Sequence, residues 1–224
     1  MELNRAEMGF KKKLVDQVRK PTGKIGRIVT KGMNKGHAKL AKWGLSKVII
    51  KPNYYILDIG CGGGVNIKNL AKIVVDGKIY GIDHSEIAVS VSKEINKEFI
   101  ENNLVKIYKA SVSSLPFQND FFNLVTGFEA YYFWPDLSKD LKEIYRVIKP
   151  KGKLVLVNEG YICNNEKKRK KAEKWSKLGH FHIHTPNEYN DFLKNAGFSN
   201  IQIFEENNKG WITVIGNKEI KEVG

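Results

Sequence analysis

Residues 56–64 of the chain read Ile56-Leu57-Asp58-Ile59-Gly60-Cys61-Gly62-Gly63-Gly64. The apolar first half predicts a buried strand, and the glycines predict a tight turn into a helix over residues 65–73. Glycines after a strand let the backbone approach a nucleotide-like ligand closely, and open α/β sheets bind ligands at the carboxyl ends of their strands. The stretch therefore predicts an α/β fold with a ligand site at this turn.

Strands and helices alternate along the chain from residue 53 onward. Ser85 and Thr185 are the predicted N-caps of two helices, and residues 206–210 predict a turn between two closing strands. This order predicts a mostly parallel sheet with one reversed strand. The predicted strands are 54–59, 78–83, 104–109, 122–127, 153–158, 200–205 and 211–216, and the predicted helices are 65–73, one after Ser85, 137–148 and 187–196.

The spacing of the glycines and acids distinguishes between nucleotide ligands. A dinucleotide fingerprint would need glycine where Val65 stands, whereas Asp83 ends the second strand at the position expected to accept hydrogen bonds from ribose hydroxyls. Asp58, two residues before Gly60, would repel a pyrophosphate but suits the ammonium and sulfonium groups of S-adenosylmethionine (SAM). The electrostatics favour SAM, and an NAD(P)-dependent oxidoreductase is the less favoured interpretation.

Over residues 53–217 the sequence resembles the class I SAM-dependent methyltransferases, in particular the small-molecule group that includes ubiquinone and menaquinone methylases. The resemblance implies an α/β fold with a Rossmann-like, seven-stranded, mostly parallel sheet whose last strand is antiparallel, with helices on both faces. The motifs that carry it are 58–64, Tyr80-Gly81-Ile82-Asp83, Ser114-Leu115-Pro116-Phe117, residues 141–152, Thr185-Pro186-Asn187-Glu188-Tyr189 and Ala196-Gly197-Phe198.

The resemblance also implies which residues hold the cofactor, with S-adenosylhomocysteine as its product. Asp58 and the glycine loop would hold the methionyl part, Asp83 the ribose, and His84 would lie beside the adenine. Family members often carry Asp where Ser111 stands, so here Ser111 and the backbone of Val112 would contact the adenine. The expected cofactor-binding set is Asp58, Gly60, Cys61, Gly62, Asp83, His84, Ser111, Val112 and Glu129.

Candidate acceptor-contacting groups follow the fourth strand. Methyl transfer is an in-line displacement at an already activated carbon, so the protein mainly aligns the nucleophile and excludes water. Glu129 is a candidate catalytic residue that could contact the acceptor or the methionyl amine. Tyr131, Tyr132 and Trp134 are candidate substrate-binding residues. The alternative is that Tyr132, Phe133 and Trp134 only pack under the next helix.

The leading segment predicts a helical cap over the cofactor cleft. A helix is expected to begin near Asn34, with Ala38, Leu40, Ala41 and Leu45 available for burial. In this family such leading helices often cover the cleft, so His37 is a candidate catalytic residue and Trp43 a candidate substrate contact.

Three histidines stand at alternate positions in residues 179–184. On an extended segment they would share one face but be spaced roughly 6–7 Å apart, too far for comfortable binding of one metal ion. We therefore expect no metal site here. His182 is a candidate catalytic residue and His180 a candidate substrate contact.

The positive charge is concentrated in two segments. The chain of 224 residues has a formal net charge of +14, of which residues 1–51 contribute fourteen Lys/Arg against three Asp/Glu and residues 164–178 seven against two. We expect residues 1–51 to form a basic helical cap and residues 52–224 the methyltransferase domain, with an inserted basic helix near 164–178. Because both segments are expected to cover the cleft, an anionic acceptor is one hypothesis.

Composition limits the class of protein. Hydrophobic residues make up 42% and charged residues 28%, no apolar run approaches the roughly 20 residues that span a bilayer, and two cysteines make no disulfide framework, which together suggest the cytoplasm. Only five of 38 basic residues are Arg, which disfavours nucleic acid as a partner.

The sequence thus predicts a methyltransferase that moves a methyl group from SAM to a small molecule, with no prediction of oligomeric state. An RNA or protein methyltransferase is the alternative. A third hypothesis is a non-catalytic SAM-binding or membrane-surface protein, suggested by a predicted basic helix at 3–18.

Overall fold

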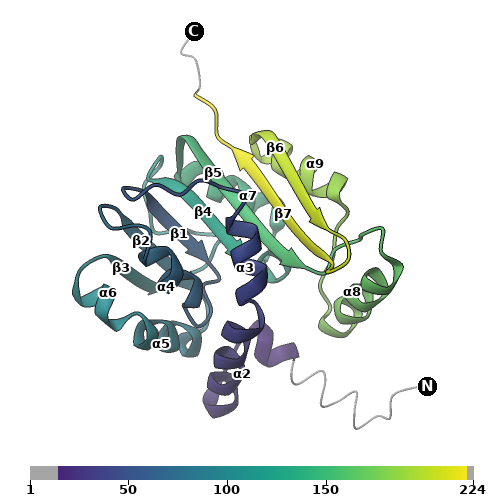
Figure 1. Ribbon diagram of the computed structural model, residues 1–224, viewed down its shortest axis with the longest axis horizontal. Helices are drawn as coiled ribbons and strands as arrows, with labels where there is room; N and C mark the ends of the chain where they lie inside the picture. The colour runs from purple at the N-terminus through teal and green to yellow at the C-terminus, as the bar shows by residue number, and fades with distance from the viewer. Residues whose placement is uncertain (1–14, 221–224) are drawn as a thin grey trace.

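A seven-stranded sheet in the order β3-β2-β1-β4-β5-β7-β6 forms the centre of the computed structural model (Figure 1), which describes residues 15–220, without the side chains of residues 34–36. Strands β1 to β5 are parallel to one another, and β7 runs antiparallel to both β5 and β6. The strands are β1 (Tyr55–Ile59), β2 (Lys78–Asp83), β3 (Val105–Lys109), β4 (Phe122–Phe128), β5 (Ile148–Glu159), β6 (Ser199–Glu206) and β7 (Trp211–Asn217).

Helices cover both faces of this sheet (Figure 1). The elements α3, α4 and α5 lie on one face, and α7 and α9 lie on the other. Helix α2 packs on α5. The helices are α2 (Gly23–Gly36), α3 (Ala38–Leu45), α4 (Val65–Ala71), α5 (Glu86–Ile95), α6 (Lys97–Glu101), the 3-10 helix η1 (Tyr131–Phe133), α7 (Leu137–Val147), α8 (Glu166–Gly179) and α9 (Pro186–Ala196).

Successive side chains of β1 point to opposite faces of the sheet and pack in two separate apolar cores. Ile56 packs with the α3 and α4 side of the sheet, and Leu57 and Ile59 pack with the α7 and α9 side. Both faces of the parallel strands are therefore buried, which is why β1 reads as a nearly continuous apolar run. The expected α/β fold with its reversed last strand is confirmed.

Most predicted boundaries agree with the structure. Ser85 caps α5 by accepting a hydrogen bond from the amide of Ala88, and Thr185 and Glu188 form a capping box at α9. Strand β5 is longer than predicted because it begins at Ile148, where it pairs with Phe122 ahead of a register irregularity.

The expectation of one helix beginning near Asn34 is wrong. Helix α2 ends at Gly36, His37 has non-helical dihedral angles (φ −95°, ψ 1°), and α3 begins at Ala38. The chain changes direction because α2 packs on α5 whereas α3 packs on β5 and β7. Ala38, expected to be buried, is consequently exposed.

The sequence-based domain division at residues 51 and 52 stays a prediction, and the basic helix predicted at 3–18 lies mostly outside the described residues.

The close approach of α3 to the sheet is made at Gly44, where an added Cβ would lie 2.4 Å from a methyl group of Val157. Within residues 15–220, none of the helices is long and apolar enough to cross a membrane.

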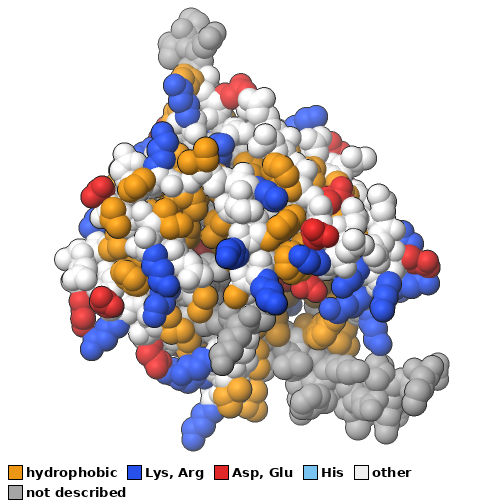
Figure 2. Space-filling model, viewed as in Figure 1, with side chains coloured by type: hydrophobic (Ala, Val, Ile, Leu, Met, Phe, Trp, Pro, Cys, Tyr) orange, Lys and Arg blue, Asp and Glu red, His pale blue; other side chains and the backbone are white. Residues whose placement is uncertain are grey.

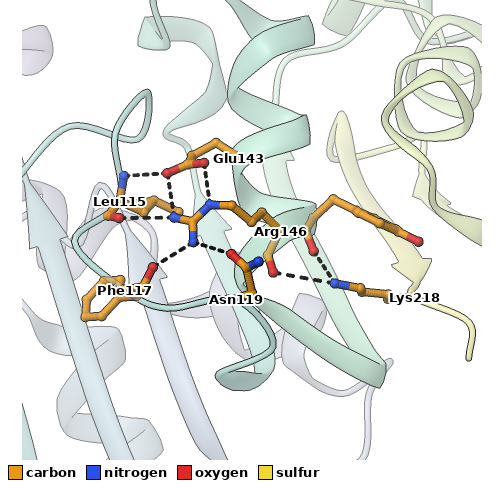
Figure 3. A network of polar contacts seen from close by, with 7 residues as sticks. Leu115, Phe117, Asn119, Glu143, Arg146 and Lys218 are labelled. Carbon is orange, nitrogen blue, oxygen red and sulfur yellow. Dashed lines mark hydrogen bonds and ion pairs between the residues drawn. The ribbon is translucent and has the colours of Figure 1, made fainter.

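Arg146 of α7 ties a surface loop to the body of the domain (Figure 3). Its guanidinium group donates to Glu143 and Asn119 and to the backbone oxygens of Leu115 and Phe117, at 2.7–3.2 Å. The amide of Leu115 in turn donates to Glu143. Four acceptors in different directions match the planar fork of arginine and not the single ammonium of lysine.

We predict that Arg146→Ala lowers the free energy of unfolding by about 1–3 kcal/mol, because it leaves carbonyl groups of the loop without donors. Arg146→Lys should recover less than half of this loss. Thermal and urea unfolding would measure both, with Lys142→Ala, an exposed lysine of the same helix, as the control. A lysine variant as stable as the wild type would show that the fork is not needed.

Candidate active site

A cavity of about 1110 Å³ opens at the carboxyl ends of the parallel strands. Its walls come from the loops after β1, β2, β4 and β5, from helix α8 and from the chain on either side of α2. This is the position at which open α/β sheets bind ligands. The sequence-predicted residues that line it are His37, Gly60, Cys61, Gly62, Asp83, His84, Ser111, Val112, Glu129, Tyr132 and Trp134.

The glycine loop turns through left-handed backbone at three positions. Gly60, Gly62 and Gly64 have φ values of 68°, 51° and 78°. A Cβ at Gly60 would lie 2.7 Å from the Cβ of Ala130, and one at Gly64 would lie 2.2 Å from the hydroxyl of Ser92. At Gly62 the nearest atom would be 4.0 Å away, so a side chain there would project into free space. The loop thus needs glycine for conformation at all three sites and for packing at two.

Polar groups of β2 and α5 hold this loop in place. One carboxylate oxygen of Asp83 accepts from the amide of Gly62 at 3.0 Å, and the other accepts from the amide of Ser85 at 2.8 Å. Asn96, a buried residue that directly follows α5, donates its side-chain amide to the carbonyl of Gly64 at 3.0 Å. Asn96 was missed by sequence reasoning because its function depends on a contact 32 residues away in the chain.

Asp58 lies beneath the loop and is 1% exposed. One of its oxygens accepts from the hydroxyl of Thr126 at 2.8 Å, and the other has no hydrogen-bond partner. Burial raises the pKa of Asp58 to about 7, an effect that the Thr126 hydrogen bond opposes and the nearby Asp83 charge reinforces. Its side chain does not border the cavity, so its expected contact with the methionyl group stays a prediction.

Glu129 is a half-buried acid on strained backbone directly after β4. Its φ of 53° lies in the left-handed region, which few non-glycine residues adopt and which is often found at functional sites. Its carboxyl group accepts from the amide of Glu159. Burial raises the pKa of Glu129 to about 8, the hydrogen bond from the Glu159 amide opposes this, and the Glu159 charge adds to it. The site therefore holds a carboxyl group that a cationic ligand would ionise.

Aromatic and cationic side chains lie around Glu159, next to Glu129. The hydroxyl of Tyr132 donates to the carbonyl of Glu159 at 2.6 Å, which fixes its ring, and Lys171 of α8 lies 3.3 Å from the Glu159 carboxylate. Burial lowers the pKa of His37, and the charge of Glu159 only partly opposes this. His37 is therefore mainly neutral near pH 7 and able to accept a proton.

Two aromatic residues expected at the acceptor lie elsewhere. Trp43 faces the sheet, with its ring centroid 5.8 Å from that of Trp211. Tyr131 is buried under α9, where its ring packs at 5.3 Å against Tyr189. Neither side chain lines the cavity. Tyr132 and Trp134 line the cavity and also pack against the apolar core.

His180 and His182, expected near the acceptor, do not line the cavity either. His180 ends α8 in a left-handed conformation (φ 49°), and both side chains are exposed outside the cavity. Phe181 and Ile183 line the cavity instead. The sequence predicts that alternate residues of 179–184 share a face, but it does not show which of the two faces points into the cavity.

Several cavity-lining residues were not singled out from the sequence. Glu159 could have been found, because it ends β5, where the strand rule already placed acceptor contacts. The inward-facing positions of α8 depend on how that helix docks. The missed residues include Glu159, Tyr161, Lys168, Lys171, Trp175, Phe181 and Lys209.

Comparisons with known proteins agree with this geometry. Residues 57–156 match a family described as a methyltransferase domain. The ubiquinone/menaquinone biosynthesis C-methyltransferase of Rickettsia felis is 32% identical over 167 residues, 68% of this chain and 66% of that protein. Cycloartenol-C-24-methyltransferase 1 of Oryza sativa is 32% identical over 116 residues, 52% of this chain, which spans only 33% of that protein.

Solved structures show the same fold. A putative S-adenosyl-L-methionine-dependent methyltransferase from Methanococcus maripaludis has a TM-score of 0.67 and 21% identity, covering 91% of this chain and 98% of that one. The protein belongs to the class I SAM-dependent methyltransferases, and SAM is the cofactor of that family. Glu129, an acid with a raised pKa that lines the cavity, suits a cationic group of that cofactor.

We predict that Glu129→Gln stabilises the ligand-free protein at high pH. A carboxyl group with a pKa of about 8 when folded and 4.5 ordinarily binds more protons in the folded state between these values, so its contribution to stability falls as pH rises through that range. The gain should be on the order of a few kcal/mol at pH ~8.5 and small near pH ~4.5. Thermal unfolding across this range measures it, with exposed Glu98→Gln as control. A gain independent of pH would contradict the assignment.

Proposed function

We propose that the protein transfers the methyl group of SAM to a small-molecule acceptor bound in the same cavity. The observation that carries this proposal is the continuity of the cavity from the glycine loop to α8. Pockets for one drug-sized ligand have volumes of roughly 300–1,000 Å³. A volume of about 1110 Å³ leaves room for an acceptor beside the cofactor.

The residues on the β1 and β2 side would hold the cofactor. Bound SAM supplies a methyl group activated by positive sulfur. Asp83 would accept hydrogen bonds from ribose hydroxyls, and the open backbone at Gly62 permits close approach. Ser111 and Val112 would border the adenine beside His84. Glu129, once ionised, would pair with the ammonium group.

The residues on the α8 side would bind the acceptor. Aromatic walls from Tyr132, Phe133, Trp134, Trp175 and Phe181 suit an apolar or ring-shaped molecule. The quinone and sterol methyltransferases among the relatives support this class.

Lys168 and Lys171 border the same space and favour an acceptor with an anionic group. Neutral His37 would accept a proton where the acceptor must lose one. The cytoplasmic location expected from the sequence stays a prediction.

Calorimetry tests the cofactor assignment. Wild type should bind SAM and S-adenosylhomocysteine but not NADH. Asp83→Ala should weaken SAM binding tenfold or more, because buried hydrogen bonds to a charged acceptor contribute about 1.5–3 kcal/mol. Gly62→Val should abolish binding, because the side chain would enter the cavity from left-handed backbone. Asp76→Ala, an exposed acid, is the control for Asp83. NADH binding, or SAM binding unaffected by Asp83→Ala, would refute the assignment.

Paired acceptors test the anionic preference. Transfer of labelled methyl from SAM to a panel of aromatic acids should exceed transfer to the matched methyl esters. The double variant Lys168→Gln/Lys171→Gln should raise the KM for the acids by roughly two- to tenfold and leave SAM affinity unchanged. Lys167→Gln/Lys170→Gln, on the outer side of the same helix, is the control. Equal KM changes for acids and esters would contradict the role of these lysines.

A further inference from the structure

Helix α2 exposes two large apolar side chains to solvent instead of packing them against neighbouring elements. Ile25 and Ile28 are 66% and 72% exposed, whereas Gly26 and Thr30 are buried beneath them. The hydroxyl of Thr30 donates to the carbonyl of Gly26 at 2.8 Å, so the inner face satisfies its own polar group. An exposed pair of this kind indicates a partner.

Cations flank these isoleucines. Lys24, Lys31 and Gly32 are exposed on the same side of the helix, and we call Lys24, Ile25, Ile28, Lys31 and Gly32 the α2 outer face. Helix α2 contains no Asp or Glu. Arg27 and Lys31 approach the same carboxylate, Glu94 of α5, and the distance for Lys31 is 3.9 Å. The outer face therefore combines apolar side chains with an excess of positive charge.

The outer face lies at the edge of the molecule that bears the cavity. Thr22 before α2, and Met33 and His37 at its other end, all line the cavity. In Figure 1 α2 forms the lower tip of the molecule, and Figure 2 shows hydrophobic and Lys or Arg side chains next to one another at that tip. A surface that met the outer face would thus lie beside the entrance to the site.

We propose that the α2 outer face docks the protein on an anionic lipid bilayer surface. Isoleucines beside lysines match a helix that lies in the interface, with apolar side chains among the acyl chains and lysines at the anionic headgroups. Single-stranded RNA is bound by stacking aromatics and arginine, and the outer face has neither. Docking would let a lipid-dissolved acceptor enter the cavity directly, a consequence that rests on the proposed function.

Sedimentation with vesicles tests the docking. The full chain at about 0.1 M salt should sediment with vesicles of phosphatidylcholine and phosphatidylglycerol, and several-fold less with phosphatidylcholine alone. Ile25→Ser/Ile28→Ser should weaken partitioning at least about fivefold, and Lys24→Gln/Lys31→Gln should weaken it by a similar factor on anionic vesicles only. Because all four side chains are exposed, the melting temperatures should stay within about 2 °C of wild type.

Matched controls separate this surface from general effects. Ile49→Ser/Val75→Ser removes apolar side chains that are 80% and 64% exposed outside α2, and Lys97→Gln/Lys139→Gln removes two exposed charges on other helices. Both should bind within twofold of wild type. The proposal is overturned if Ile25→Ser/Ile28→Ser binds as wild type does, if wild type ignores anionic vesicles, or if wild type retains single-stranded RNA in a salt-sensitive manner and no vesicles. Calorimetry with SAM on the same preparations is independent, so failed docking with intact SAM binding leaves the proposed function standing.

Discussion

The cavity depends on the carboxylate of Asp83, which holds a left-handed glycine turn in place. Its two oxygens accept from the amides of Gly62 and Ser85, and so join the loop after β1 to the start of α5. The same turn can form only because Gly60 leaves room for Ala130 after β4. Three strand ends thereby meet around one void, and a ligand that contacts Asp83 contacts the residue that shapes its own site.

A second constraint on the site is that three of its carboxyl groups are largely removed from water and have no Lys or Arg side chain within residues 15–220 as a partner. Asp58, Asp83 and Glu129 all have raised pKa values, mainly because they are removed from water. In the ligand-free protein this arrangement opposes full ionisation. A ligand with positive charges stabilises the ionised carboxylates and lowers their pKa values, so binding of a sulfonium compound is expected to release protons from the site. Lys171 of α8 pairs instead with Glu159, the neighbouring acid at the end of β5.

Much of the core could be predicted from the sequence because local rules and tertiary packing agree there. Strand β1, the glycine turn and Asp83 are close in sequence, and their spacing is a direct consequence of the strand-turn-helix-strand unit. The leading helix was predicted poorly because nothing local shows that α2 and α3 pack on different partners and break at His37. For a similar reason, the sequence did not show that Phe181 and Ile183 line the cavity whereas His180 and His182 lie outside it. The sequence shows that residues of two kinds alternate here, but the elements against which α8 and this loop pack determine which kind is buried.

The sequence by itself determined the parallel sheet, its reversed last strand and the cofactor loop, because each follows from apolar periodicity and glycine positions within a few tens of residues. Only the tertiary structure decided which side chains form the acceptor wall. Glu159, Lys171 and Phe181 meet there across β5 and the chain around α8, whereas Trp43 and Tyr131 are taken into the packed core. It also showed that α2 turns its isoleucines outward, since exposure is a property of packing and not of composition.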